Sequence, residues 1–307
     1  NNLNCIAPGK HLEKTILNKP FDFLFSINNG YIIPEKILDH PTLGCINYHN
    51  SLLPRNAGLF ASHHVILEGD NTHGVTWHYM AKEIDAGDIL IQKEFPVSEN
   101  DMTSNLDLKS FEVAVSSFQE LISGLQDASL KPKKQDLSKR TYHGKYERPD
   151  NACILPFDQT AEKVFALYRS LTFKDRIPNE LGTPKILLDD SLYIVISMEI
   201  MPDQSQKEPG TIISCGDAIR ISTKTNIVSI KELANIKGIR QGVEEICAKH
   251  NIKPGKKISQ QEKMKKLLTD VCQELIRKEQ FWIRQFQQSS PLSCPEPQYP
   301  EERSLSE

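Results

Sequence analysis

From residue 21 to residue 125, short apolar runs alternate with helical periodicity, and this alternation restricts the fold more than any other feature. Runs at 21–27, 44–48, 74–80 and 88–97 suit buried strands, and Gly or Pro punctuates the stretches between them. A helix is expected over residues 61–67. A longer helix is expected where apolar residues keep three- and four-residue spacing: Leu108, Phe111, Val115, Phe118, Ile122 and Leu125. The pattern predicts an α/β fold with a mostly parallel sheet.

The composition changes at Lys131. Residues 131–150 are polar and basic, which is typical of a linker. After a helix near Thr160–Leu171, short β-like runs cluster at 185–188, 192–197, 210–214, 218–222 and 227–230, and they predict a small barrel or sandwich. An amphipathic helix follows, and a tail rich in Pro and Ser ends the sequence. We therefore divide the chain into a core (1–130), a linker (131–150), a barrel domain (151–235) and a helical tail with a disordered linker (236–307).

Charge and cysteine content narrow the class of protein. A net charge of -3 and a pI of about 6.3 argue against general binding to nucleic acid or anionic membranes. No apolar run approaches the roughly 20 residues that span a bilayer. The seven cysteines are odd in number and form no C-x-x-C, which argues against a disulfide framework or a structural zinc site. These features favour a cytoplasmic protein in a reducing compartment.

The stretch CINYHNSLLP, residues 45–54, ends an apolar run with Asn47 and His49 two positions apart. Residues two apart on a strand face the same side, so both side chains project together at the strand end. An amide N–H donates to a developing oxyanion, and an imidazole transfers protons near neutral pH. The alternative is a structural role, in which both side chains only form the hydrogen bonds of a turn.

A carboxylate to charge or orient the imidazole is expected nearby, and Asp85 in KEIDAGDIL is the best candidate. The stretch DAGD is also a good β-turn by itself, in which Asp85 and Asp88 are equally suited to be solvated turn residues. Four histidines, His63, His64, His73 and His78, match no common zinc spacing. We expect the first three on a helix or loop surface, leave His78 open, and expect no metal.

Taken together, INYHNSLLPRNAG and GDNTHGVTWHYMAKEIDAGDILIQ resemble the folate-dependent formyltransferase family in order and approximate spacing. The resemblance implies a Rossmann-like catalytic core, followed by a small OB-like barrel matching residues 151–232 and then a C-terminal helix. Family cores begin with a strand, a glycine-containing turn and a helix. We find no counterpart before Ile6, so the core is expected to lack its N-terminal strands.

The resemblance also implies roles for individual residues. Asn47, His49 and Asp85 match the family's catalytic Asn, His and Asp, and the formyl donor would be 10-formyltetrahydrofolate. The expected contacts with folate lie in three segments that match the family's folate-binding segments. They are Tyr31, Ile32, Ile33, Ser51, Leu52, Leu53, Pro54, His78, Met80 and Ile84.

The acceptor amine is less constrained. The sequence of residues 48–80 most resembles formyltransferase domains of nonribosomal peptide synthetases, whose acceptor is an aminoacyl group on a carrier protein. A synthetase module downstream of this chain would fit the sequence of the tail. The basic linker would also suit methionyl-tRNA as the acceptor, because Lys and Arg side chains can contact its phosphates. A sugar amine is a further alternative for the acceptor. A different class is an inactive folate-binding or scaffold domain.

Overall fold

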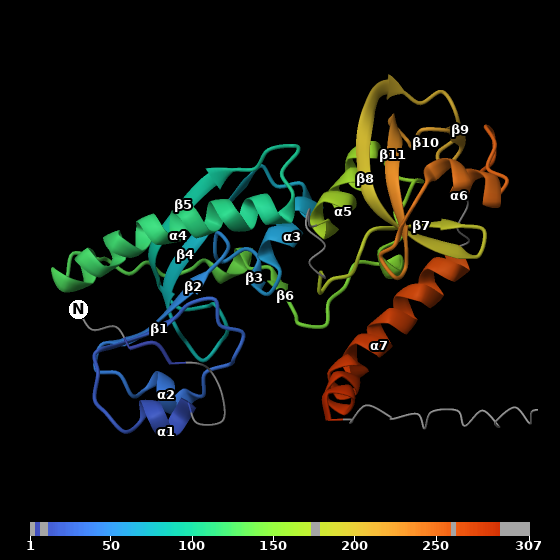
Figure 1. The fold of residues 1–307 in the computed structure, drawn as a ribbon. Helices are drawn as coiled ribbons and strands as arrows, with labels where there is room; N and C mark the ends of the chain where they lie inside the picture. The colour runs from blue at the N-terminus through green and yellow to red at the C-terminus, as the bar shows by residue number, and fades with distance from the viewer. Residues whose placement is uncertain (1–3, 7–11, 173–178, 259–261, 289–307) are drawn as a thin grey trace, which may run out of the picture.

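The computed structural model describes residues 4–6, 12–172, 179–258 and 262–288. Figure 1 shows an N-terminal sheet with a long helix across it, a curled C-terminal sheet beside it, and a final helix, α7, that extends away from the second sheet. The predicted tail at 289–307 lies outside the described residues. None of the helices within these ranges combines the length and apolar character needed to cross a membrane.

The N-terminal elements follow the predicted alternation of strands and helices. They are α1 (Leu12–Ile16), β1 (Phe23–Ser26), α2 (Glu35–Leu38), β2 (Gly44–His49), β3 (Ala57–Gly58), α3 (Ala61–Glu68), β4 (Thr72–Tyr79), β5 (Ile89–Pro96), α4 (Thr103–Gln126), η1 (Leu137–Lys139) and β6 (Tyr142–His143).

The N-terminal sheet has the strand order β1-β2-β4-β5. β1 and β2 are parallel, whereas β2–β4 and β4–β5 are antiparallel. The α/β class is therefore confirmed, and the described sheet is mixed where we expected mostly parallel pairing. The connection through α3 brings the chain back at the end where β2 finished, so Thr76 of β4 lies opposite His49 and His78 lies opposite Asn47.

Aromatic packing holds α4 against one face of this sheet. The Trp77 ring lies 5.3 Å from the Phe118 ring of α4, and Phe25 of β1 meets the Phe118 ring edge-on at 5.7 Å. The Trp77 Nε1–H donates to Ser117 Oγ at 2.9 Å, which satisfies the indole in the buried interior. These contacts anchor α4 to the sheet that carries Asn47 and His49.

The apolar stripe predicted for α4 is only partly buried. Leu106 and Leu121 are buried, but Leu108, Phe111 and Val115 are 59%, 65% and 53% exposed. The helix expected from this spacing is confirmed, but the spacing does not mark its buried face. The buried face instead includes small residues such as Ser110 and Ser117, which let the helix backbone approach the sheet closely.

The C-terminal elements form an antiparallel sheet of six strands, in the order β7-β8-β11-β10-β9, with β12 paired to β11. It curls around a core that includes Ile186, Ile219 and Ile230, all at 0% exposure. This half-barrel confirms the predicted barrel-like second part. Its elements are η2 (Asn151–Cys153), α5 (Ala161–Leu171), β7 (Lys185–Leu188), β8 (Ser191–Gln204), β9 (Ile212–Ser214), β10 (Ile219–Ser222), β11 (Asn226–Asn235), β12 (Arg240–Gln241), α6 (Val243–Lys249) and α7 (Glu262–Gln288).

Candidate active site

The structure brings the three candidate catalytic side chains together. Asn47 and His49 project from the end of β2, and Asp85 reaches them from the loop between β4 and β5. Asn47 Nδ2 lies 3.3 Å from Asp85 Oδ1, and His49 Nδ1 lies 3.5 Å from Asp85 Oδ2. Local strand alternation thus places two of the groups, and the loop supplies the third.

The Asp85 loop is held in a constrained conformation. Asp85 has φ of 54°, in the left-handed region that residues with a Cβ rarely adopt. Gly87 fits only because it lacks a Cβ, since one built there would lie 1.8 Å from the Tyr79 carbonyl oxygen. The Gln135 side-chain amide donates to the carbonyls of Asp85 and Gly87 at 2.8 and 2.7 Å. This amide bridges the turn and fixes the direction of the carboxylate.

His49 is oriented by a backbone group. Its Nε2 lies 2.8 Å from the carbonyl oxygen of Asn56. Because a carbonyl oxygen only accepts, we assign the Nε2–H tautomer, which leaves the Nδ1 lone pair facing Asp85. Burial lowers the pKa of His49 below its ordinary 6.5, although the Asp85 charge and the Asn56 carbonyl oppose the shift. The ring is therefore neutral at pH 7 and able to accept a proton.

Asp85 stays ionised at the same pH. Burial alone raises its pKa, but the interactions with His78 and His49 and the hydrogen bond from the Gly58 N–H outweigh burial and hold the pKa below its usual range. The Gly58 N–H donates to Asp85 Oδ2 at 2.8 Å. A neutral imidazole beside a fixed carboxylate is the pairing needed to stabilise an imidazolium that forms during a reaction.

His78 belongs to this group and not only to a ligand-binding segment. It is 1% exposed, and its Nε2 lies 3.3 Å from Asn47 Nδ2 and 3.5 Å from Asp85 Oδ1. Its Nδ1 lies 2.8 Å from the Tyr79 carbonyl oxygen. His78 therefore packs behind both Asn47 and Asp85, where it restrains the amide and the carboxylate.

The residues expected to contact folate divide by exposure. Tyr31, Ile32 and Ile84 are 41%, 73% and 40% exposed, so their side chains are accessible to a ligand. Leu52, Pro54 and Met80 are half-buried.

Three others are turned into the protein. Ile33 and Leu53 are core residues, and the Ser51 hydroxyl donates to the Arg55 carbonyl at 2.8 Å. These three hold the shape of their segments and offer a ligand backbone groups at most.

The polar stretch predicted as a linker forms part of the site. Lys133 pairs with Ile89 through backbone hydrogen bonds of 2.8 and 2.9 Å, and β6 pairs with β3. Arg140 donates to the Ile84 carbonyl at 2.8 Å. Sequence reasoning missed Asn56, Gln135 and Arg140, because their roles arise from contacts between distant segments.

The three histidines expected at the surface are buried, so that expectation was wrong. His63, His64 and His73 are 8%, 8% and 1% exposed, because α3 packs between α4 and α5 and β4 lies inside the sheet. Burial lowers the pKa of each of them to about 4.

His64 also stacks on His143, with ring centroids 3.4 Å apart and planes 7° apart, beside Glu147. Their nitrogen and carboxylate atoms lie within 4.8 Å of one another, close enough to suggest a metal site. Lone pairs of imidazole lie in the ring plane, and parallel planes 3.4 Å apart cannot both direct them at one ion about 2 Å away. As placed, the two rings are a stacked pair and not a convergent ligand set.

Comparison with known proteins identifies the family. Residues 12–122 match the family model described as formyl transferase, and residues 149–251 match that of its C-terminal domain. A methionyl-tRNA formyltransferase from a Geobacillus species is 32% identical over 230 residues, which cover 74% of this chain and 69% of that protein. This chain belongs to the formyltransferase family.

Two further relatives define the extent of the likeness. A Bacillus licheniformis methionyl-tRNA formyltransferase is 31% identical over 212 residues, which cover 69% of this chain and 64% of that protein. The chain thus spans slightly less than two thirds of its length. Among solved structures, the formyltransferase from Helicobacter canadensis matches with a TM-score of 0.58 at 20% identity, over 71% of this chain and 77% of that one, which shows a shared fold.

Proposed function

We propose that this formyltransferase moves the formyl group of 10-formyltetrahydrofolate to a primary amine, with Asn47, His49 and Asp85 as its catalytic residues. The observation that carries the proposal is the convergence of an amide, a neutral imidazole and a carboxylate at one end of β2. Family membership supports the reaction class, and the Helicobacter canadensis structure holds folinic acid and dTDP-3-aminofucose.

The reaction requires attack by a neutral amine on the formyl carbon. Asn47 donates an N–H to the oxygen that becomes negative in the tetrahedral intermediate. Its present contacts to Asp85 and His78 are both long, at 3.3 Å, so redirecting one N–H costs little. Asn47 thus provides charge stabilisation that is needed mainly in the transition state.

Proton transfer falls to His49. As the new C–N bond forms, Nδ1 accepts the proton that the amine nitrogen loses, and Asp85 stabilises the resulting imidazolium. When the bond between the formyl carbon and the folate nitrogen breaks, the same proton passes to that nitrogen. His49 returns to its neutral form, held throughout by Asn56.

For the acceptor, we propose an aminoacyl group on a carrier protein of a nonribosomal peptide synthetase. The proposal rests on the resemblance of the sequence at residues 48–80 to formyltransferase domains of such synthetases. Methionyl-tRNA is the second candidate, because the curated relatives named above are methionyl-tRNA formyltransferases. A sugar amine is the third, and an inactive folate-binding scaffold is the candidate of another class.

A transfer assay with the protein in its natural full length separates these candidates. Radiolabelled 10-formyltetrahydrofolate is offered with an aminoacyl-loaded carrier protein, methionyl-tRNA or a dTDP-amino sugar. We expect label on the carrier-bound amino acid and little on the other two. Label on methionyl-tRNA alone would reassign the acceptor, and folate binding without transfer to any amine would identify a scaffold.

A further inference from the structure

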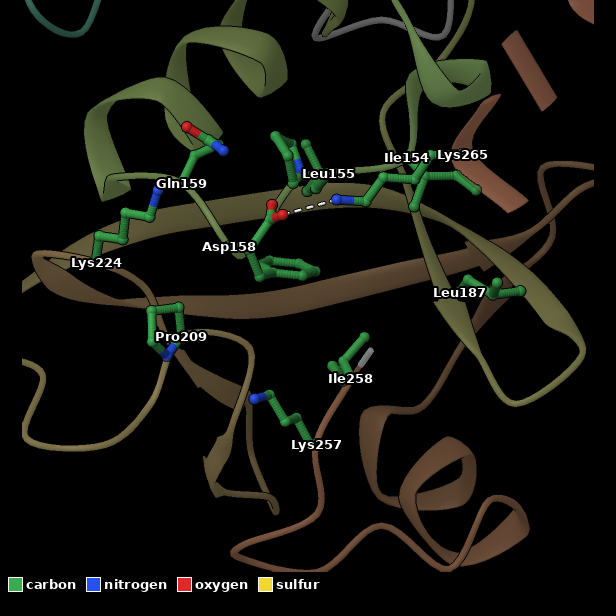
Figure 2. A pocket seen from close by; sticks show the side chains of 12 residues that line it. Ile154, Leu155, Asp158, Gln159, Leu187, Pro209, Lys224, Lys257, Ile258 and Lys265 are labelled. Atoms are coloured by element: carbon green, nitrogen blue, oxygen red, sulfur yellow. Dashed lines mark hydrogen bonds and ion pairs between the residues drawn. The ribbon is translucent and has the colours of Figure 1, made fainter. Parts of the chain in front are cut away.

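A pocket of about 470 Å³ opens in the C-terminal half-barrel and shares no residue with the candidate active site. Its volume falls in the range of roughly 300–1,000 Å³ that is typical of small-molecule sites. Figure 2 shows that its walls come from the segment before α5, from β7, from two turns of the half-barrel and from α7.

The pocket walls are fixed by backbone hydrogen bonds between segments distant in sequence. Leu155 N–H donates to the Lys185 carbonyl at 2.8 Å, Lys224 N–H to Gln159 at 2.9 Å, and Ile258 N–H to Gly210 at 2.8 Å. The cavity is therefore preformed, which reduces the ordering cost of binding.

The lining combines an apolar wall with an excess of positive charge. Leu155, Phe157, Leu187 and Ile258 supply apolar surface. Three lysines and a single carboxylate, Asp158, complete the charged lining, which leaves two positive charges in excess. In Figure 2 the lysines Lys224, Lys257 and Lys265 enter from different sides.

Two of these lysines are available to a ligand. Lys265 is engaged by Asp158 at 2.7 Å. Lys257 contacts Glu208 at 2.8 Å, but both side chains are at least half exposed, and such surface pairs contribute little and exchange readily. Lys224 is exposed and forms no ion pair within the described ranges of the chain.

We propose that this pocket binds a phosphate monoester that carries an apolar arm. Lysine ammonium groups bind phosphate as point charges from variable directions, which suits two lysines that come from separate segments. A dianion matches the charges of Lys224 and Lys257 once it displaces the exposed Glu208 from Lys257, whereas an uncharged or cationic ligand brings no such compensation. The partly exposed Leu187 and Ile258 receive the arm, above a floor formed by the buried Leu155 and Phe157.

Isothermal titration of the whole chain tests this with n-hexyl phosphate, inorganic phosphate and 1-hexanol as probes. We expect hexyl phosphate to bind at least ten times more tightly than either of the others, and more weakly at high salt. Equal affinity for hexanol and hexyl phosphate, or no heat with hexyl phosphate at millimolar concentration, would overturn the proposal.

Matched variants locate the binding. Lys224→Ala and Lys257→Ala should each weaken hexyl phosphate binding by about tenfold. Lys231→Ala is the control, because Lys231 also contacts an exposed glutamate, Glu199, but lies outside the pocket. Wild-type affinity in both pocket variants would contradict the assignment, with circular dichroism as the check on folding. The titration contains neither folate nor amine, so its failure is separate from any failure of formyl transfer.

Discussion

His49 Nδ1 lies 3.5 Å from Asp85 Oδ2, at the end of the imidazole opposite to the nitrogen held by a backbone carbonyl. The distance exceeds that of a good hydrogen bond but is short enough for strong attraction once the ring is charged. Asp85 therefore acts on the imidazolium through its charge, while Asn56 sets the ring orientation. This division of roles leads to distinct predictions for each residue.

His49→Ala and Asn47→Ala should slow formyl transfer far more than they weaken folate binding. Both groups act on charge and protons that appear mainly in the transition state, so the loss falls on kcat. We expect a loss on the order of a hundredfold or more for each variant. Single-turnover rates and folate titrations on the same preparations give the comparison. Equal losses in rate and affinity would assign both residues to ground-state binding.

The rate should depend on pH through His49 in its neutral form. Because burial lowers the pKa of His49 below 6.5, kcat/KM should be level at neutral pH and fall only on the acid side of 6.5. Asp85 raises the pKa of His49, so Asp85→Asn should move this acid limb to still lower pH. A limb that moves upward in the variant would show that another group controls the profile.

Gln135→Met should reduce kcat while leaving folate affinity largely unchanged. The substitution removes both N–H donors to the Asp85 and Gly87 carbonyls, so the loop loses the bridge that aims the carboxylate. A loss of ten- to a hundredfold is on the order expected for a misplaced catalytic group. Gln126→Met, at the exposed end of α4, is the matched control. A fall in thermal stability with unchanged kcat would assign Gln135 a structural role only.

Stability should fall as the pH drops from 6.5 towards 4, in part through the buried histidines. His63, His64 and His73 have folded pKa values of about 4, so the unfolded chain binds more protons in this window and unfolding becomes easier in acid. Each histidine contributes a slope of up to about 1.4 kcal/mol per pH unit.

The measurement is urea unfolding at several pH values. His73→Leu should remove one such contribution from the slope. An unaltered slope in His73→Leu would show that this residue is protonated to the same extent in the folded and unfolded states.

The features that could be predicted from the sequence are those that follow from local periodicity. The pairing of Asn47 with His49 follows from strand alternation, and α4 follows from its repeat. The buried face of α4 was not predictable, because the small residues that approach the sheet, such as Ser117, carry no apolar signal. Gln135 lies fifty positions from Asp85, so the clamp exists only once the chain has folded.

The choice between Asp85 and Asp88 is the most direct test of the proposed mechanism. Asp85 lies among Asn47, His49 and His78, whereas Asp88 accepts a backbone hydrogen bond from Tyr79 through its own carbonyl. The measurement is the single-turnover rate of formyl transfer by Asp85→Asn and Asp88→Asn in the full-length protein. We predict a loss on the order of a hundredfold or more for Asp85→Asn and a rate near that of the wild type for Asp88→Asn. A dead Asp88 variant with an active Asp85 variant would contradict the assignment, and full activity in both would contradict the proposed proton transfer.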